Sequence, residues 1–255
     1  MVSQTTGRGR AEHIPTIRSR NRQRFWLAEF YGSAIGKKAV MAITGIMLLG
    51  FVLVHMIGNL KLYMGANGEH LNAYGEYLRE IGEPILPHTG FLWIMRSALI
   101  LAFVLHIHAA MTLTLVNRKA RPQKYLGGRE YAAANYAART MRWSGVIVGL
   151  YLVFHLMDMT WGWHVLHSSF QDGKPYENLL HSFAAERWPI SVVYVVANVL
   201  LGIHIYHGAW SLFQSLGWNN PRFNVWRNWF AKAFAAVIVI GNVSFPIAVL
   251  TGIVS

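Results

Sequence analysis

Four histidines lie in four long apolar segments of this chain, one in each segment, and successive ones are about fifty residues apart. They are His55, His106, His155 and His204. An ionisable side chain is costly inside a bilayer, and those that occur there usually face the interior of a helix bundle and mark a functional path. Histidine is also a common axial ligand of haem iron. One such residue on each of four helices therefore indicates two membrane-buried b haems, each held by two histidines.

Five apolar stretches are long enough to cross a membrane as helices, because a hydrocarbon core of about 30 Å needs roughly twenty residues. The predicted spans are Ala39–Leu60, Phe91–Val116, Trp143–Trp163, Pro189–Leu212 and Ala231–Val254. Hydrophobic residues make up 54% of the 255 residues and charged residues only 13%, a more apolar balance than that of soluble domains. The sequence thus predicts an all-α integral membrane protein in which the first four helices form a haem-binding bundle and a fifth accompanies it.

The net charge of +12 is distributed unevenly along the chain. The arginine-rich start, the loop 117–142 and the loop before the fifth span are basic, whereas the other two loops are slightly acidic. Lys and Arg accumulate on the cytoplasmic side of membranes, so this alternation predicts a cytoplasmic N-terminus and an external C-terminus. Residues 1–38 are then a cytoplasmic basic arm and residues 39–255 the membrane domain. An organelle transit peptide is the alternative for the arm, and the charge requires no nucleic acid partner.

The chain contains no cysteine. A disulfide, a thiolate-held iron–sulfur cluster and the covalent attachment of a c-type haem are therefore excluded. Any haem must be held by histidine without a covalent link.

The depth of each histidine predicts how the four are paired. With the N-terminus inside, a rise of about 1.5 Å per residue places His55 about 24 Å and His155 about 18 Å from the inner starts of their helices. The same rise places His106 about 15 Å and His204 about 13 Å from the inner ends of theirs. We therefore expect His55 and His155 to hold a haem nearer the outside, and His106 and His204 a second haem nearer the cytoplasm. A hydrogen-bonded packing role is the alternative for any one of them taken singly.

Two further histidines, His108 and His207, share the second and fourth spans. A porphyrin beside a helix needs small residues one turn from its ligand, because positions three and four apart share a helix face. Around His106 these places hold alanine, at positions 102, 109 and 110, whereas His108 has larger neighbours. His204 has Gly208 one turn away. We therefore expect His106 and His204 to be the ligands, and His207 to hydrogen-bond a haem propionate or to lie near the inner surface.

Arg96 and Asp158 are the other charged residues at membrane depth, both toward the outer side. Arg96 is a candidate partner for a haem propionate or for an acid of the outer loop, and snorkelling to the interface is its alternative. Asp158 follows His155 by one turn and shares its face. It is a candidate for proton transfer at an outer quinone site, or for orienting a nearby polar group.

The chain resembles a known family, the five-helix, two-haem cytochrome b subunits that anchor succinate:menaquinone oxidoreductases and quinol:fumarate reductases. The resemblance extends over nearly all of the chain from Gly32 onward. It rests on G-S-A-I-G-K-K-A-V-M-A-I-T-G (Gly32–Gly45), V-H-M-I-G-N-L (Val54–Leu60), H-I-H-A-A followed by N-R-K-A-R-P (Asn117–Pro122), F-H-L (Phe154–Leu156), and G-I-H-I-Y-H-G-A-W-S (Gly202–Ser211) followed by L-G-W.

The resemblance implies a function and a set of partners. Family members ligate a distal haem from the first and third helices and a proximal haem from the second and fourth, which gives His55, His155, His106 and His204 those roles. A flavoprotein subunit and an iron–sulfur subunit lie on the cytoplasmic face of a bacterial cell membrane, and the basic inner loops are a candidate docking surface, with attraction to lipid headgroups as the alternative.

The resemblance also implies menaquinone exchange near the distal haem, assisted by an acidic side chain. Glu76, Glu80 and Glu83 are the candidates in the outer loop, and no motif selects one. A proton-conducting glutamate found two residues before the fourth ligand in one family variant is replaced here by Gly202.

Two other functions remain open from the residues alone. Buried histidines with Asp158 are also typical of a proton- or ion-coupled transporter. A structural anchor with unused haem sites is the second alternative. Neither alternative would require the two haems that the histidine pairs predict.

Overall fold

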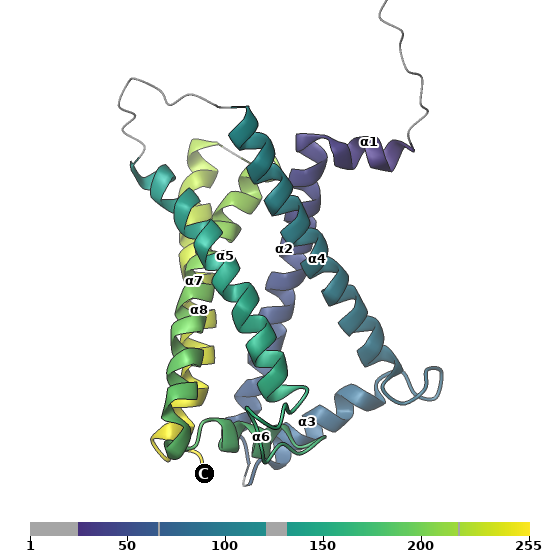
Figure 1. The fold of residues 1–255 in the computed structure, drawn as a ribbon, viewed down its shortest axis with the longest axis vertical. Coiled ribbons are helices and arrows are strands. Elements are labelled where there is room, and N and C mark those ends of the chain that lie inside the picture. Colours follow the sequence, from purple (N-terminus) through teal and green to yellow (C-terminus); the bar gives the residue numbers. More distant parts are fainter. Residues whose placement is uncertain (1–24, 66, 121–131, 219) are drawn as a thin grey trace, which may run out of the picture.

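The computed structural model describes residues 25–65, 67–120, 132–218 and 220–255, and the regular elements in these ranges are all helices. Five of the described helices are long and apolar enough to cross a membrane, which confirms the predicted all-α, five-span architecture. They are α2 (Ala34–Asn59), α4 (Gly90–Lys119), α5 (Ala132–Met159), α7 (Trp188–Ser215) and α8 (Pro221–Leu250). All five run between the two ends of the molecule (Figure 1).

The bounds of all five spans differ from the prediction, and those of α5 and α8 differ most. α5 begins at Ala132, well before the predicted start at Trp143. α8 begins at Pro221, well before the predicted start at Ala231, because proline suits the first helical position and the Asn220 side chain accepts a hydrogen bond from the Phe223 amide at 2.9 Å. α5 ends at Met159, before the predicted end at Trp163. The chain then turns at Gly162, whose φ of 55° glycine adopts without strain.

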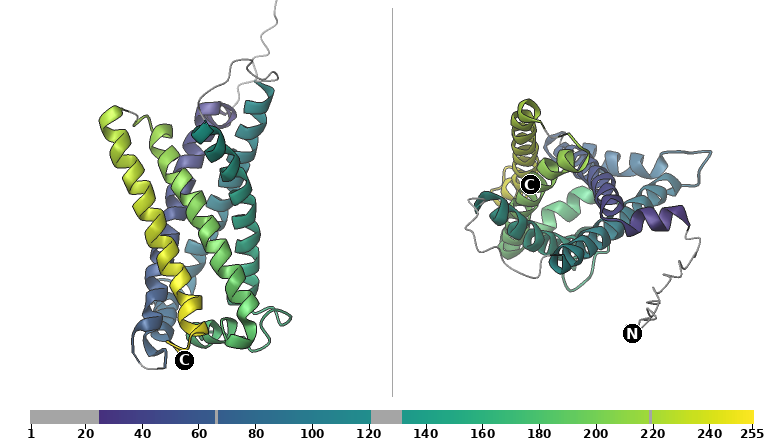
Figure 2. Two further views of the ribbon diagram at one scale, coloured as in Figure 1. Left: turned by 90° about the vertical axis from the view of Figure 1, so that its left-hand side faces the viewer. Right: turned by 90° about the horizontal axis from the view of Figure 1, so that it is seen from above.

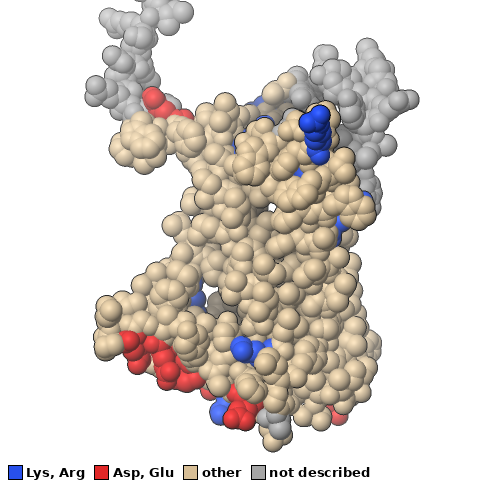
Figure 3. Space-filling model, turned by 180° about the vertical axis from the view of Figure 1, so that it is seen from behind, with Lys and Arg blue, Asp and Glu red and all other residues tan. Residues whose placement is uncertain are grey.

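Short helices cover the two ends of the bundle. At one end α1 (Trp26–Gly32) lies across the start of α2 (Figure 1). At the other end lie α3 (Glu69–Glu80) and α6 (Pro175–Ser182), with two 3-10 turns, η1 (Leu60–Tyr63) and η2 (Ala185–Arg187). Acidic side chains gather along α3 (Figure 3). We call the end with α3 and α6 the acidic end and the end with α1 the basic end. Residues 1–24 of the predicted basic arm and 121–131 of the basic loop lie outside the described residues.

The long helices form two closely packed pairs. α2 packs against α4, α5 packs against α7, and a smaller contact between α2 and α7 joins the pairs. In the described parts of these helices, backbone contact between α2 and α5, between α4 and α7, and between α4 and α5 is sparse at most. Seen from above, the four helices surround a common axis, with α8 beside α7 (Figure 2). The helices on each diagonal of the bundle, α2 with α5 and α4 with α7, are therefore not closely packed.

The packed core lies toward the acidic end and along α7 and α8. It combines apolar side chains of α2, α3, α6, α7 and α8 with the 3-10 turn η1: Met56, Leu62, Leu71, Tyr176, Leu179, Phe183, Tyr194, Ile205, Ala235, Ile238 and Phe245. Gly202 lets α8 approach α7 closely, because a Cβ there would overlap the Val239 side chain. The core therefore fixes the acidic end and the α7–α8 contact, whereas the interior between the two helix pairs is less filled.

Candidate functional site

His55 of α2 and His155 of α5 face each other across one diagonal of the bundle. Their ring centroids are 5.9 Å apart, with the rings edge to face. A metal–imidazole nitrogen bond is about 2 Å long, so two imidazoles on opposite sides of one metal ion have a centroid separation of about 6 Å. We call these two residues the acidic-end pair.

His106 of α4 and His204 of α7 lie near each other across the other diagonal. We call them the basic-end pair. A hydroxyl from the adjacent helix meets each ring. Thr44 Oγ1 of α2 lies 3.1 Å from His106 Nδ1, and Ser144 Oγ of α5 lies 3.2 Å from His204 Nδ1.

These hydroxyl contacts determine which ring nitrogen carries the proton. Thr44 donates its own hydrogen to the Val40 carbonyl at 2.7 Å, and Ser144 donates to the Met141 carbonyl at 3.2 Å. Each hydroxyl oxygen is therefore left to accept from an Nδ1–H group. The Nε2 atoms of His106 and His204 then keep their lone pairs, which is the state that a metal ligand needs.

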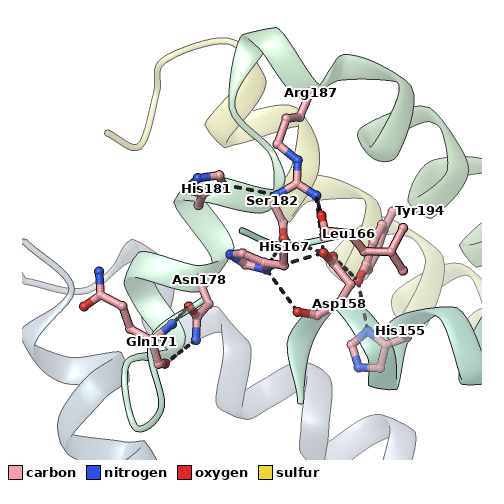
Figure 4. A network of polar contacts seen from close by, with 10 residues as sticks. All are labelled: His155, Asp158, Leu166, His167, Gln171, Asn178, His181, Ser182, Arg187 and Tyr194. Carbon is pink, nitrogen blue, oxygen red and sulfur yellow. Dashed lines mark hydrogen bonds and ion pairs between the residues drawn. The ribbon is translucent and has the colours of Figure 1, made fainter. Parts of the chain in front are cut away.

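His155 is oriented by a longer chain of hydrogen bonds (Figure 4). The Tyr194 hydroxyl donates to Asp158 Oδ2 at 2.9 Å and lies 3.3 Å from His155 Nδ1, so its oxygen accepts from the Nδ1–H group. Nε2 of His155 is again the nitrogen with the lone pair. On the opposite ring, His55 Nε2 lies 3.3 Å from the Asn59 amide nitrogen, and Phe51 stacks on His55 with a centroid distance of 5.3 Å.

The helices on each diagonal make little backbone contact, as a flat group held between two axial ligands would require. Both pairs span these diagonals. His55 is exposed and is not covered by side chains of the described residues. A Cβ added at Gly50, Gly149 or Gly208 would meet no atom within 4 Å. The described residues form no cluster of three or more His, Asp or Glu side chains suited to a free metal ion, whereas a porphyrin supplies four ligands itself and needs only such pairs.

Asp158 is the centre of a buried polar network at the end of α5. Its side chain is 0% exposed. Ser182 Oγ donates to Oδ2 at 3.0 Å, while Arg187 and His167 each lie 3.4 Å from Oδ1. Arg187 also donates to the Leu166 carbonyl. The network ties α5 to the loop after it, to α6 and to α7 (Figure 4). Both carboxylate oxygens of this buried group therefore have partners.

His167 belongs to this network and lies outside the spanning helices. It is 1% exposed, and burial lowers the pKa of its imidazole below the usual 6.5. The Asp158 carbonyl and carboxylate oppose that shift, whereas Arg187 and His181 reinforce it. His167 therefore remains neutral, with its Nδ1 atom 3.0 Å from the Asp158 carbonyl oxygen.

The two rival histidines make other contacts. Nδ1 of His108 lies 2.5 Å from the Tyr31 hydroxyl of α1, and the two rings stack at 5.7 Å. His108 thus ties α1 to α4. His207 is half-buried, and its Nε2 lies 3.3 Å from Thr140 Oγ1. The small neighbours expected around His106 are present, since Ala102 and Ala109 are buried.

The remaining charged candidates lie at the surface. Arg96 is exposed, with its guanidinium 5.2 Å above the Trp93 ring, an arrangement typical of an interfacial arginine. Glu76 pairs with Arg79 at 3.2 Å, and Glu83 lies 3.0 Å from His88. Glu80 is exposed at the end of α3. The structure does not link these three glutamates to either histidine pair through any hydrogen bond or ion pair of the described residues.

Sequence reasoning missed the groups that contact the histidines and Asp158. Tyr194, Ser182 and Arg187 come from later segments of the chain and His167 from the loop after α5, and nothing in their spacing predicts that they meet Asp158. The sequence did contain a signal for Thr44 and Ser144, because each directly precedes a glycine on a helix with one of the four histidines.

No family model, curated protein or solved structure matches this chain. The case for a function therefore depends on the geometry of the two histidine pairs.

Proposed function

We propose that this chain is the di-haem cytochrome b membrane-anchor subunit of a succinate:menaquinone oxidoreductase or quinol:fumarate reductase in a bacterial cell membrane. Two b haems would carry electrons between a cytoplasmic iron–sulfur subunit and membrane menaquinone. One observation carries the proposal: two histidine pairs bridge the two unpacked diagonals of the bundle, and three of the four rings have their Nδ1 atoms against hydroxyl oxygens.

The residues of each pair determine what kind of chemistry the site supports. Two axial histidines leave haem iron no open position, which suits electron transfer and does not suit oxygen activation. Thr44, Ser144 and Tyr194 fix the protonated nitrogen on the ring that each contacts. The chain thus supplies two ligands per site, and the dehydrogenase chemistry belongs to partner subunits.

The two pairs lie at different depths along the bundle. Thr44 marks the level of the basic-end pair, and a rise of about 1.5 Å per residue places His55 about 16 Å further along the same helix. The pairs therefore form two levels between the basic and acidic ends. This arrangement supports a route across the membrane, with the cytoplasmic subunits at the basic end and quinone exchange at the acidic end.

The acidic end offers a proton pathway for quinone chemistry in the proposed complex. Asp158 is buried, but Arg187 and His181 are only half-buried, and they connect its network toward the surface. Glu76, Glu80 and Glu83 lie on and just after α3 at the same end. These groups are the candidates for proton transfer, with Asp158 as the one nearest a histidine pair.

The test is a redox difference spectrum of the purified, fully assembled complex with a haem-to-protein ratio. We expect b-type bands and about two haems per chain, as two bis-histidine sites require. His106→Leu should remove one haem, or both if they assemble together. The neighbouring His108→Leu is the matched control and should retain both, because His108 contacts Tyr31 instead of a second histidine.

A fully assembled complex that contains no haem would overturn the proposal. Transport of protons or ions in haem-free vesicles, without a difference spectrum, would instead support the transporter alternative. Loss of haem from His108→Leu but not from His106→Leu would show that the ligands were assigned to the wrong residues.

A further inference from the structure

We propose that Thr44 and Ser144 are equivalent positioning residues, which orient His106 and His204 as ligands and thereby set the affinity and the reduction potential of the basic-end haem. This inference rests on the proposed function, because it concerns how the same site holds its group.

The contacts on the two sides of this site are nearly identical. Thr44 and Ser144 are 5% and 3% exposed, and their hydroxyl oxygens lie 3.1 and 3.2 Å from the Nδ1 atoms of His106 and His204. Both hydroxyls donate to a carbonyl of their own helix. Each contact joins the two helices of one closely packed pair, α2 to α4 and α5 to α7. A hydroxyl that only needed a partner would be satisfied by its own helix carbonyl, so the second contact serves the histidine.

The same short pattern produces both contacts. Met-x-x-Thr-Gly in α2 (41–45) and Met-x-x-Ser-Gly in α5 (141–145) are each followed, after an equal number of residues, by His55 or His155. Each of these helices therefore supplies one ligand of the acidic-end pair and holds one ligand of the basic-end pair.

The glycine after each hydroxyl residue lies beside the imidazole. A Cβ at position 45 would lie 3.6 Å from Cε1 of His106, and a Cβ at position 145 would lie 3.3 Å from Cε1 of His204. The hydroxyl and the adjacent glycine thus form one contact surface for each ring. Because the same surface occurs on two helices, chance packing is a poor explanation of the contacts.

A hydrogen bond at Nδ1 acts on the metal through the ring. It fixes the tautomer and the ring orientation, and it raises the basicity of Nε2, so its loss typically lowers metal affinity by about 10- to 100-fold. A more basic ligand stabilises the oxidised metal, so removing the hydroxyl should raise the reduction potential. The two contacts are long for hydrogen bonds, at 3.1 and 3.2 Å, so we expect an affinity loss near the lower end of this range, about tenfold.

The test compares variants that remove or keep the hydroxyl in the assembled complex. Thr44→Val keeps the shape of the side chain without the hydroxyl, and Thr44→Ser keeps the hydroxyl; Ser144→Ala and Ser144→Thr make the same comparison on α5. We expect Thr44→Val and Ser144→Ala to lower retention of the haem that His106→Leu removes, and to raise its midpoint potential. The serine and threonine variants should behave as the parent, and the potential of the other haem should not change.

Thr114→Val is the matched control, because the Thr114 hydroxyl donates only to the Ala110 carbonyl of its own helix among the hydrogen bonds of the described residues, at 2.8 Å. Equal changes in Thr44→Val and Thr44→Ser would overturn the inference, since packing and not the hydroxyl would then be responsible. An unchanged potential and haem content in both hydroxyl-free variants would also overturn it. A parent complex without haem would instead overturn the proposed function.

Discussion

The hydroxyls that contact the two histidine pairs donate to different kinds of acceptor. At the basic-end pair, the hydroxyls of Thr44 and Ser144 end on neutral backbone carbonyls of their own helices. At the acidic-end pair, the Tyr194 hydroxyl beside His155 ends on the buried Asp158 carboxylate. One site is thus positioned by the helices alone, and the other is connected to a charged network.

This difference follows from the surroundings of each pair. A helix interior far from its ends can offer carbonyl oxygens only to hydroxyls that reach back along the helix, as Thr44 does. At the end of α5, a loop and two short helices bring Ser182, Arg187 and His167 around Asp158. A buried carboxylate is tolerated where such partners surround it. The acidic end therefore combines ligand positioning with the tertiary structure of the loops, whereas the basic-end pair depends on local helix geometry.

The largest expected effect is on stability, and it compares the loss of a buried charge that has hydrogen-bond partners with the loss of one that has few. Asp158→Ala would leave Arg187 without its carboxylate and the Tyr194 and Ser182 hydroxyls without their acceptor, so it should destabilise the protein by about 3–5 kcal/mol. Arg227 near the basic end is also buried, but its Nε and Nη1 atoms have no hydrogen-bond partner among the residues that the structure describes, and its guanidinium lies 4.7 Å above the Trp210 ring. Arg227→Met should therefore change stability by less than about 1 kcal/mol. Thermal unfolding of the purified protein in detergent measures both.

Asp158→Asn is the control for this comparison. Its amide oxygen can still accept from Tyr194 and Ser182, but its amide nitrogen donates and leaves Arg187 without an acceptor there. The cost of Asp158→Asn should therefore lie between the costs of the other two variants. If Asp158→Ala and Arg227→Met had equal effects, the network at the acidic end would contribute nothing beyond the burial of one charge.

A smaller change in stability is expected as the pH changes, and it should arise from His167 at the acidic end. Burial lowers the folded-state pKa of His167 below the unfolded value of 6.5, so the folded protein binds fewer protons than the unfolded chain in that range. Its contribution to stability is therefore present above pH 6.5 and is lost as the pH falls from there through the folded-state pKa. Unfolding temperatures measured between pH 8 and pH 5 should decrease toward acid, and His167→Gln should reduce that decrease.

His164 lies in the same loop and is exposed, so His164→Gln is the matched control. It should leave the pH dependence as it is in the parent. A parent protein that becomes more stable below pH 6.5 would contradict the assigned direction, because His167 would then be protonated more readily in the folded state.

The sequence predicted the elements that depend on local composition and left out those that depend on tertiary contact. Apolar length was sufficient for five spans. The choice of His106 over His108 as a haem ligand stays a prediction, and His108 contacts Tyr31. The partners of Asp158 could not be predicted, because they come from a loop and from helices whose arrangement no periodicity encodes. The early start of α8 was missed because its first turns are polar, although Asn220 and Pro221 are a cap signal.

The smallest expected effect compares the two halves of the basic-end site. Gly45→Ala would place a Cβ 3.6 Å from His106, an ordinary van der Waals contact, and should stabilise the helix by about 0.5–1 kcal/mol. Gly145→Ala would place a Cβ 3.3 Å from His204, so the imidazole must move by a few tenths of an ångström and the gain should be cancelled. In the proposed complex, only Gly145→Ala should therefore alter the spectrum of the haem held by the basic-end pair. Equal spectra and equal unfolding temperatures for the two variants would show that both positions accept a Cβ equally well. The shorter distance at position 145 would then have no functional consequence.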